Sequence, residues 1–242
     1  MAVLKAVLFD MDGVIADTEM LDHRIQVAFV RMVNDEVGSF SDGLSFEGLL
    51  GSSGTDLTAR LCELTGGRLA PDDLERRFAA FDAAAREGTD YGALFRPQVV
   101  EILEFAREHG LKTAVVSSSS PEHIAEVLDA CGIGGRFDIV MSGELVERSK
   151  PDPEVYLQTI ERLGVQPGEC VAIEDSAAGI AAAKAAGAVV IAYEERRVPV
   201  DQSAADYLAH DMADAAQLVR DLCAASMGIV STGRLEARSD CS

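Results

Sequence analysis

From residue 96 onward, short apolar runs alternate with amphipathic helix patterns, and this alternation restricts the fold more than any other feature of the sequence. Apolar runs bounded by turn residues are typical of buried strands. One more such run lies near the N-terminus, at residues 3–9. Strands joined by single helices make right-handed crossovers, so they share one parallel sheet covered by helices on both faces. The sequence therefore predicts a doubly wound α/β core of Rossmann-like form.

The turn and cap residues of this half agree with the same alternation. Ser120 and Asp152 are placed to cap the N-termini of two helices that have a proline in the first turn. Gly110 and Gly164 are placed to end two helices. In chain order we expect a helix at 97–110, a strand at 111–117, a helix at 121–132, a strand at 137–142, a helix at 152–164, a strand at 170–175, a helix at 176–187, a strand at 188–193, a short edge strand at 205–210 and a last helix at 211–223.

Between the first strand and this half, residues 17–94 carry only helical patterns, at 21–33, 55–67 and 72–88. Asp72 or Asp73 is placed to cap the third helix. We therefore expect two domains and a tail. The domains are an α/β core of residues 1–16 and 95–223 and an inserted helical domain of residues 17–94; residues 224–242 would form a flexible tail.

Charge and cysteine content narrow the class of protein. Acidic residues outnumber basic ones by 41 to 21, a net charge of −20 that repels nucleic acid and anionic membranes. No apolar run approaches the roughly 18 residues of a membrane span, and the N-terminus has no signal-peptide cleavage pattern. The five cysteines are scattered and form no metal or disulfide pattern. We expect a cytoplasmic monomer with reduced thiols and with neither nucleic acid nor membrane as a partner.

Polar residues gather where the predicted strands end, which is where an open α/β sheet binds ligands. These strand-end residues are Asp10 and Asp12 after the first strand, Ser117, Ser118 and Ser119 at the end of the second, Lys150 after the third, and Glu174 and Asp175 at the end of the fourth. Four carboxylates, a lysine and a serine run would therefore meet at one edge of the sheet.

Two carboxylates spaced as Asp10 and Asp12 can divide the work of nucleophile and proton donor, because residues two apart on extended chain point to the same side. Together with Glu174 and Asp175, Asp10 forms a candidate Mg²⁺ site, since Mg²⁺ prefers oxygen ligands. A divalent cation would also offset the repulsion between this acidic chain and an anionic substrate. Taken singly, these acids would also fit an acidic turn and a helix cap.

Ser117 precedes a helix N-terminus, where hydroxyl and backbone N–H groups suit a phosphate. Lys150 lies between Ser149 and Pro151 and is placed to pair with phosphate oxygens and with Asp10. The alternative to a phosphate-binding role is a structural one, in which the serines only cap the helix and Lys150 is a solvated loop residue.

Four motifs in this order, FDMDGVIADTE, AVVSSSS, SKPDPEVY and AIEDSAAG, resemble the haloacid dehalogenase-like superfamily over residues 3–220. The similar branch includes β-phosphoglucomutase and phosphoglycolate phosphatase. The resemblance implies a helical cap at 17–94 with hinges near residues 16–17 and 94–97. It implies that Asp10 is the nucleophile that becomes an aspartyl phosphate, and that Asp12 is the general acid/base and lends its backbone carbonyl to Mg²⁺. It also implies that Ser117 and Lys150 hold the phosphoryl group and that Asp175 and Glu174 belong to the metal site. Ser118, next to Ser117, is a further candidate for phosphate binding.

The chain departs from that family pattern in the expected cap. Gly54 stands where the mutase has an arginine that grips a second phosphate, and Asp22 stands where many relatives have a histidine. His23 is one position later and points about 100° round the helix. The candidate substrate-binding residues of the cap are Asp22, His23, Gly51, Ser52, Ser53 and Gly54.

These observations predict a Mg²⁺-dependent phosphatase acting on a small phosphorylated metabolite, a sugar or polyol phosphate. A β-phosphoglucomutase-like mutase is the close alternative. A hydrolytic dehalogenase, a phosphoacceptor signalling domain and a non-catalytic binding protein agree less well with the strand-end residues and with the insert.

Overall fold

A six-stranded sheet forms the centre of this computed structural model, which describes residues 2–38, 43–46, 49, 54–197 and 200–228. Its strands are β1 (Ala6–Phe9), β2 (Lys112–Ser117), β3 (Ile139–Ser142), β4 (Cys170–Glu174), β5 (Val189–Tyr193) and β6 (Tyr207–Ala209). Their order is β3-β2-β1-β4-β5-β6, and every neighbouring pair is parallel. This confirms the predicted doubly wound α/β core.

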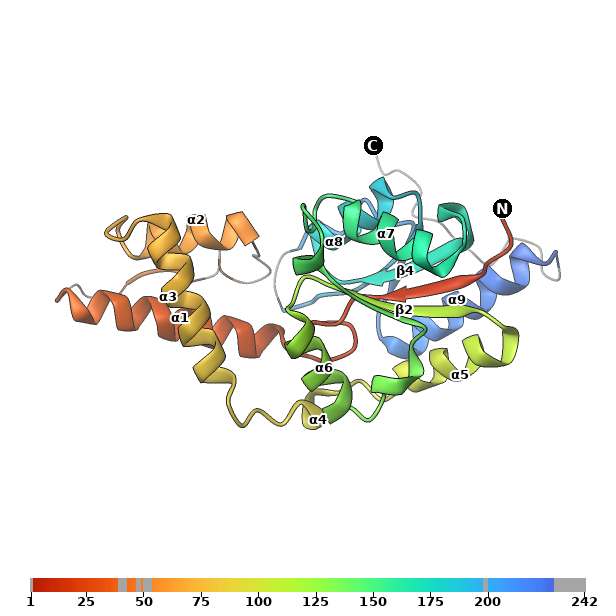
Figure 1. Ribbon diagram of the computed structural model, residues 1–242, viewed down its shortest axis with the longest axis horizontal. Coiled ribbons are helices and arrows are strands. Elements are labelled where there is room, and N and C mark those ends of the chain that lie inside the picture. The colour runs from red at the N-terminus through yellow and green to blue at the C-terminus, as the bar shows by residue number, and fades with distance from the viewer. Residues whose placement is uncertain (1, 39–42, 47–48, 50–53, 198–199, 229–242) are drawn as a thin grey trace. The chain divides into compact units, whose positions relative to one another are not determined.

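Helices cover both faces of the sheet, which is why β1 can be a run of four buried apolar residues. Figure 1 shows α7 and α8 on one side of the sheet and α5 and α9 on the other. The helices of this part are α4 (Tyr91–Leu94), α5 (Val99–His109), α6 (Pro121–Ala130), α7 (Glu154–Leu163), α8 (Ala177–Ala185) and α9 (Met212–Ser226), with short 3₁₀ turns η2 (Gly134–Arg136), η3 (Gly143–Leu145) and η4 (Pro167–Glu169).

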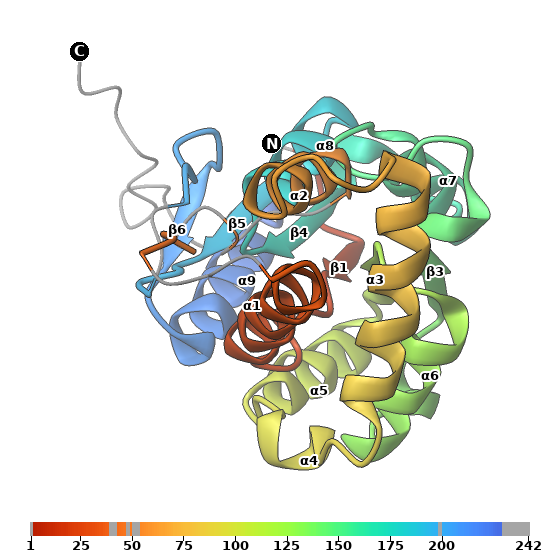
Figure 2. The same ribbon diagram turned by 90° about the vertical axis from the view of Figure 1, so that its left-hand side faces the viewer.

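The chain divides into two units, one of Met1–Asp17 with Tyr91–Ser242 and one of Thr18–Asp90. The second unit contains α1 (Glu19–Glu36), α2 (Gly54–Leu64) and α3 (Pro71–Arg86), and its described residues include no strand. Figure 2 shows α1 nearly end-on with α3 beside it. Its core is built around Phe29, whose ring packs against Phe78 and Phe81 at centroid distances of 5.2 and 5.6 Å.

Several helix ends agree with the sequence. The Ser120 hydroxyl accepts a hydrogen bond from the His123 backbone N–H at the start of α6. Gly110 and Gly164 end α5 and α7 in the left-handed conformation, at φ of 67° and 70°. That conformation is readily open to glycine, which explains both stops.

Several predicted helix boundaries and caps differ from the structure. Neither Asp72 nor Asp73 caps α3, because Pro71, whose fixed φ suits the first helical position, already starts it, after Ala70 as the N-cap. Pro153, not Asp152, is the N-cap of α7, although the Asp152 carboxylate still accepts from the Glu154 N–H at 3.0 Å. Two helix ends also differ: α5 begins at Val99, two residues after the expected 97, and α9 continues to Ser226. Residues 224–226 of the expected tail are therefore helical, and residues 229–242 lie outside the described part.

None of the described helices combines the length and the apolar character that a bilayer crossing requires. Within the described residues, the four cysteines Cys62, Cys131, Cys170 and Cys223 are all free thiols.

Truncating the aromatic centre of the second unit tests its packing. We expect Phe29→Ala to destabilise this unit by about 3–5 kcal/mol, because the fully buried ring leaves a cavity among its neighbours. Hydrogen exchange should become faster in α1 and α3 while β1 and β4 stay protected. Met20→Ala is the matched control, since Met20 is 40% exposed on the same helix. Equal protection of α1 in the two variants would contradict this view of the core.

Candidate active site

Asp10 follows β1, the strand that lies between β2 and β4. Its backbone N–H donates to the Ile173 carbonyl at 3.0 Å, which continues the pairing of β1 with β4 by one residue. Alternate residues of these two strands, Ala6 and Leu8 of β1 and Ala172 of β4, belong to the core cluster under α7 and α8. Because side chains alternate along a strand, the same face continues into Asp10, which is 7% exposed.

Lys150 joins two carboxylates at this strand end. Its ammonium lies 2.6 Å from Asp10 Oδ1 and 2.7 Å from Glu174 Oε1, and it donates to the Val116 carbonyl at 2.8 Å. The Lys150 side chain is 5% exposed and is followed by a cis peptide bond to Pro151. Burial lowers the pKa of Lys150, but the two carboxylates outweigh it and hold that pKa above its usual value. Lys150 therefore supplies a permanent buried positive charge.

Asp10, Glu174 and Asp175 form a buried acidic cluster in which one oxygen of each lies within 4.8 Å of the others. Burial, followed by the charges of Glu174 and Asp12, raises the pKa of Asp10 to about 8, although Lys150 opposes the shift. One ammonium thus faces three buried carboxyl groups, and this excess of acids favours a proton or a cation at the site. The donors are all oxygens, as Mg²⁺ prefers, so this cluster fits a hard divalent cation. The carboxylate of Asp12 is not part of the cluster.

Asp12 lies on the tight turn that leaves β1. The Ile15 N–H donates to the Met11 carbonyl at 2.8 Å, and the Ser119 hydroxyl donates to Asp12 Oδ2 at 2.9 Å. Gly13 has a φ of 81°, and a Cβ atom at this position would lie 1.7 Å from Asp175 Oδ2. The turn can therefore approach the acidic cluster only because residue 13 has no side chain.

The serine run after β2 forms a second turn at this edge. Ser117 is 1% exposed, and its hydroxyl accepts from the Ser119 N–H at 3.1 Å. The Ser142 hydroxyl donates to the Ser119 carbonyl at 2.6 Å. Ser118 is exposed, with its hydroxyl 3.4 Å from that of Ser149. Thus Ser120 caps the helix, whereas Ser119 reaches Asp12.

Two side chains that the sequence did not single out hold the neighbouring backbone. Gln202 donates its amide to the carbonyls of Asp175 and Tyr193, each at 2.7 Å. Arg96 donates to the Gly13 carbonyl at 3.1 Å and lies 4.5 Å from the centroid of the Tyr193 ring. Its guanidinium is also 3.1 Å from Asp17. These contacts join segments far apart in the chain, and no local pattern signals them.

The predicted cap residues are found in the second unit as far as they are described. Asp22 is ion-paired with Arg86 at 2.6 Å, and Arg86 also contacts Asp82 at 2.8 Å. Gly54 is the first residue of α2. Gly51, Ser52 and Ser53 lie outside the described residues.

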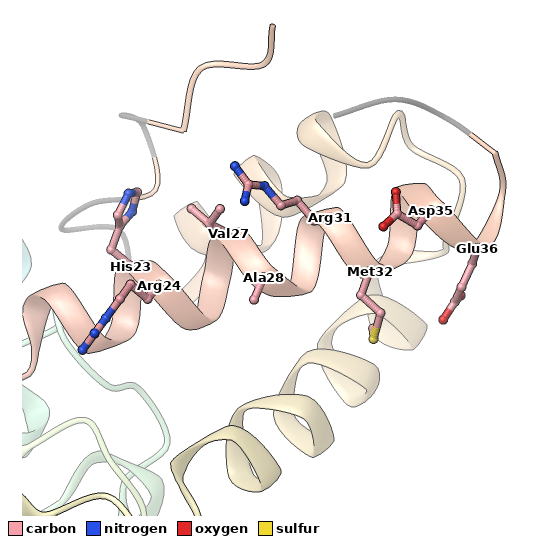
Figure 3. A pocket seen from close by; sticks show the side chains of 8 residues that line it. All are labelled: His23, Arg24, Val27, Ala28, Arg31, Met32, Asp35 and Glu36. Carbon is pink, nitrogen blue, oxygen red and sulfur yellow. The ribbon is translucent and has the colours of Figure 1, made fainter. Parts of the chain in front are cut away.

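His23 lies at one end of a groove along α1, shown in Figure 3. Burial lowers its pKa, and its Nδ1 atom is buried with no hydrogen-bond partner among the described residues. The groove is lined by His23, Arg24, Val27, Ala28, Arg31, Met32, Asp35 and Glu36. It contains none of the carboxylates of the acidic cluster.

Comparison with known proteins agrees with this geometry. The family model for haloacid dehalogenase-like hydrolases matches residues 4–187. Protein CbbY of Rhodobacter capsulatus is 30% identical over 227 residues, which cover 88% of this chain and 96% of that protein. The phosphorylated carbohydrates phosphatase of Thermotoga maritima is 31% identical over 188 residues, covering 76% of this chain and 82% of that one. A mutant of CbbY from Rhodobacter sphaeroides, solved in complex with xylulose-1,5-bisphosphate, has a TM-score of 0.67 at 26% identity and covers 87% of this chain and 96% of its own.

The close approach of Gly13 to Asp175 can be tested with a methyl group. We expect Gly13→Ala to weaken Mg²⁺ binding by at least about tenfold, because the new Cβ must displace the Asp175 carboxylate from the cluster. Titration calorimetry with MgCl₂ measures this. Gly110→Ala is the matched control, since its φ is also positive but a Cβ there meets nothing within 4 Å. A folded Gly13→Ala protein with unchanged Mg²⁺ affinity would show that the approach is not needed.

Proposed function

The chain belongs to the haloacid dehalogenase-like hydrolase family, and we propose that it is a Mg²⁺-dependent phosphatase of small phosphorylated metabolites, sugar or polyol phosphates. The observation that carries the proposal is the buried ammonium of Lys150 between Asp10 and Glu174. Phosphoryl transfer needs positioning and neutralisation of charge, and both are built into this contact. The names and ligands of the relatives described above, a phosphatase of phosphorylated carbohydrates and a protein that binds a sugar bisphosphate, support the substrate class.

Asp10 is the proposed nucleophile. Lys150 contacts its Oδ1 atom, which leaves Oδ2 to attack the phosphorus of the substrate. A bond forms between this oxygen and phosphorus, and the bond from phosphorus to the ester oxygen breaks. The product of this step is an aspartyl phosphate, and the leaving alkoxide takes a proton.

Asp12 is the proposed source of that proton. The hydrogen bond from Ser119 holds its carboxyl group in place on the turn after β1. In the second step a water molecule attacks the aspartyl phosphate, Asp12 takes the proton of the water, and inorganic phosphate leaves with Asp10 restored. One carboxyl group therefore acts first as acid and then as base, which returns the enzyme to its starting state.

Asp10, Glu174, Asp175 and the backbone carbonyl of Asp12 are the proposed ligands of Mg²⁺. When bound, the cation supplies positive charge toward the phosphoryl oxygens. Lys150 and the serines Ser117 and Ser118 are the proposed phosphate-binding groups on the protein side. The Ser117 oxygen accepts from the Ser119 N–H, so its own hydrogen remains available to donate.

We further propose that residues 17–94 act as a cap, hinged near residues 16–17 and 94–97, that closes over a small substrate and excludes water. Asp22, His23, Gly51, Ser52, Ser53 and Gly54 remain the proposed substrate-binding residues of the cap. The pairing of Asp22 with Arg86 means that Asp22 would act as part of an ion pair. A cytoplasmic location and a monomeric state also belong to this proposal.

The substrate class is tested by incubation with a panel of hexose, pentose and polyol phosphates. We expect release of inorganic phosphate with MgCl₂, its loss when EDTA removes the cation, and its return on adding excess Mg²⁺. Phosphate is measured colorimetrically, and sugar isomers are measured in the same samples by chromatography. Isomer formation without free phosphate would favour the mutase alternative, and activity indifferent to EDTA would remove the metal from the proposal.

Replacing the nucleophile tests the covalent step. We expect Asp10→Asn, which keeps the shape of the side chain, to lower phosphate release by at least about three orders of magnitude. Asp12→Asn should cost about 10²–10⁴-fold, because it removes only the proton transfer. Thermal unfolding checks that both variants fold. Undiminished ester cleavage by folded Asp10→Asn protein is the result that rules out Asp10 as the nucleophile.

A further inference from the structure

Tyr156 carries a buried hydroxyl group for which the proposed reaction has no use. It lies in α7, six residues after Lys150, and its side chain is fully buried in the core cluster that α7 and α8 share with the sheet. The hydroxyl donates a hydrogen bond to Oε1 of Glu174. A phenylalanine would fill the same apolar space, so packing alone does not explain why the ring carries an oxygen.

Two donors converge on the same oxygen of Glu174. Its Oε1 atom contacts the Lys150 ammonium at 2.7 Å and also accepts from Tyr156. The ammonium lies 5.4 Å from the centroid of the Tyr156 ring, so these three groups form one compact cluster. A carboxylate oxygen has two lone-pair positions, and both are engaged at Oε1. The second oxygen, Oε2, accepts from the Ser176 hydroxyl at 3.5 Å and keeps one lone-pair position for a further ligand.

The Glu174 carboxylate also packs against the start of α8. A Cβ atom at Gly179, in the first turn of α8, would lie 1.9 Å from Oε2 and 2.2 Å from Oε1, so the carboxylate has no room to move on that side. Glu174 itself has no exposed surface. Its orientation is therefore decided by buried neighbours and not by solvent.

The hydroxyl of Tyr156 keeps its hydrogen in this setting. The usual pKa of a tyrosine hydroxyl is about 10, so it is protonated at neutral pH. Tyr156 can thus serve as a permanent donor, and it leaves the charge of Lys150 unchanged. A buried carboxylate that loses one of its donors would be short of a hydrogen bond that water cannot replace.

We propose that Tyr156 is a positioning residue, whose hydroxyl fixes Glu174 Oε1 on the Lys150 side and so holds the Glu174 carboxylate in its orientation at the cation site. The inference rests on the proposed function, because it assigns Tyr156 a role toward the same metal centre. It predicts that metal affinity depends on a residue that touches neither the metal nor the substrate. Partners of this kind are worth about 10–100-fold in metal affinity.

The test is the affinity of the protein for MgCl₂ alone, measured by titration calorimetry without substrate. We expect Tyr156→Phe to bind Mg²⁺ about 10–100-fold more weakly than the wild type. The matched control is Tyr207→Phe. Tyr207 lies on β6, the edge strand opposite β3, whereas α7 packs on β2 and β3, so this variant should bind Mg²⁺ as the wild type does. A purely structural role would lower the unfolding temperature of Tyr156→Phe and leave the Mg²⁺ affinity unchanged, and that result overturns the proposal.

A double variant keeps the test decisive if Tyr156→Phe does not fold. Glu174→Gln with Tyr156→Phe has no buried carboxylate short of a donor, so it should fold. It should bind Mg²⁺ no more weakly than Glu174→Gln alone, because Tyr156 acts through Glu174; a further loss of affinity would overturn the proposal. Wild-type protein that shows no Mg²⁺ binding would instead contradict the metal centre itself.

Discussion

The buried contact of Lys150 with Asp10 and Glu174 is the interaction on which the rest of the site depends. Placing carboxylates at the end of two central strands is unfavourable unless a positive charge accompanies them. The ammonium arrives on the loop after β3 and lies 2.6 and 2.7 Å from the two carboxylates. Removing it would leave two buried acids beside Asp175 with no compensating charge. The same contact therefore makes the core tolerable and the chemistry possible.

The order of the strands explains why these particular residues meet. After β1 the chain forms β2 and β3 on one side of it and then crosses to form β4 on the other side. Strand β1 therefore lies between β2 and β4, which belong to the two halves of the sheet. Ligands of such sheets bind beyond the carboxyl ends of the strands, where the order reverses. Asp10 follows β1, and Glu174 ends β4 directly beside it. The turn with Gly13 then brings Asp12 toward the same edge, held by Ser119 from the end of β2.

The sequence was sufficient for those parts of the site that follow from topology. Asp10 and Glu174 lie at strand ends that can be recognised locally, and parallel pairing then brings them together. Tyr156 and Arg96 could not be found in this way, because their partners are 18 and 83 residues distant in the chain. Ser119 was placed at this edge, but its contact with Asp12, 107 residues distant, was not predicted. Their roles depend on which helix packs on which strand. The start of α3 was wrong for a more local reason, since Pro71 fits the first helical position ahead of the two aspartates considered as caps.

The negative charge of the protein acts in opposite directions on its two proposed ligands, the phosphate ester and the cation. A net charge of −20 repels a phosphate ester at long range, but it attracts divalent cations toward the surface. The cluster of three buried acids with a single ammonium continues this bias at short range, because its excess of acidic groups favours a further positive charge. A bound divalent cation would neutralise the negative field that a phosphoryl group meets at Asp10. The acidity that makes the chain a poor partner for anions is thus compatible with a phosphatase, provided that cation and lysine act together at the strand ends.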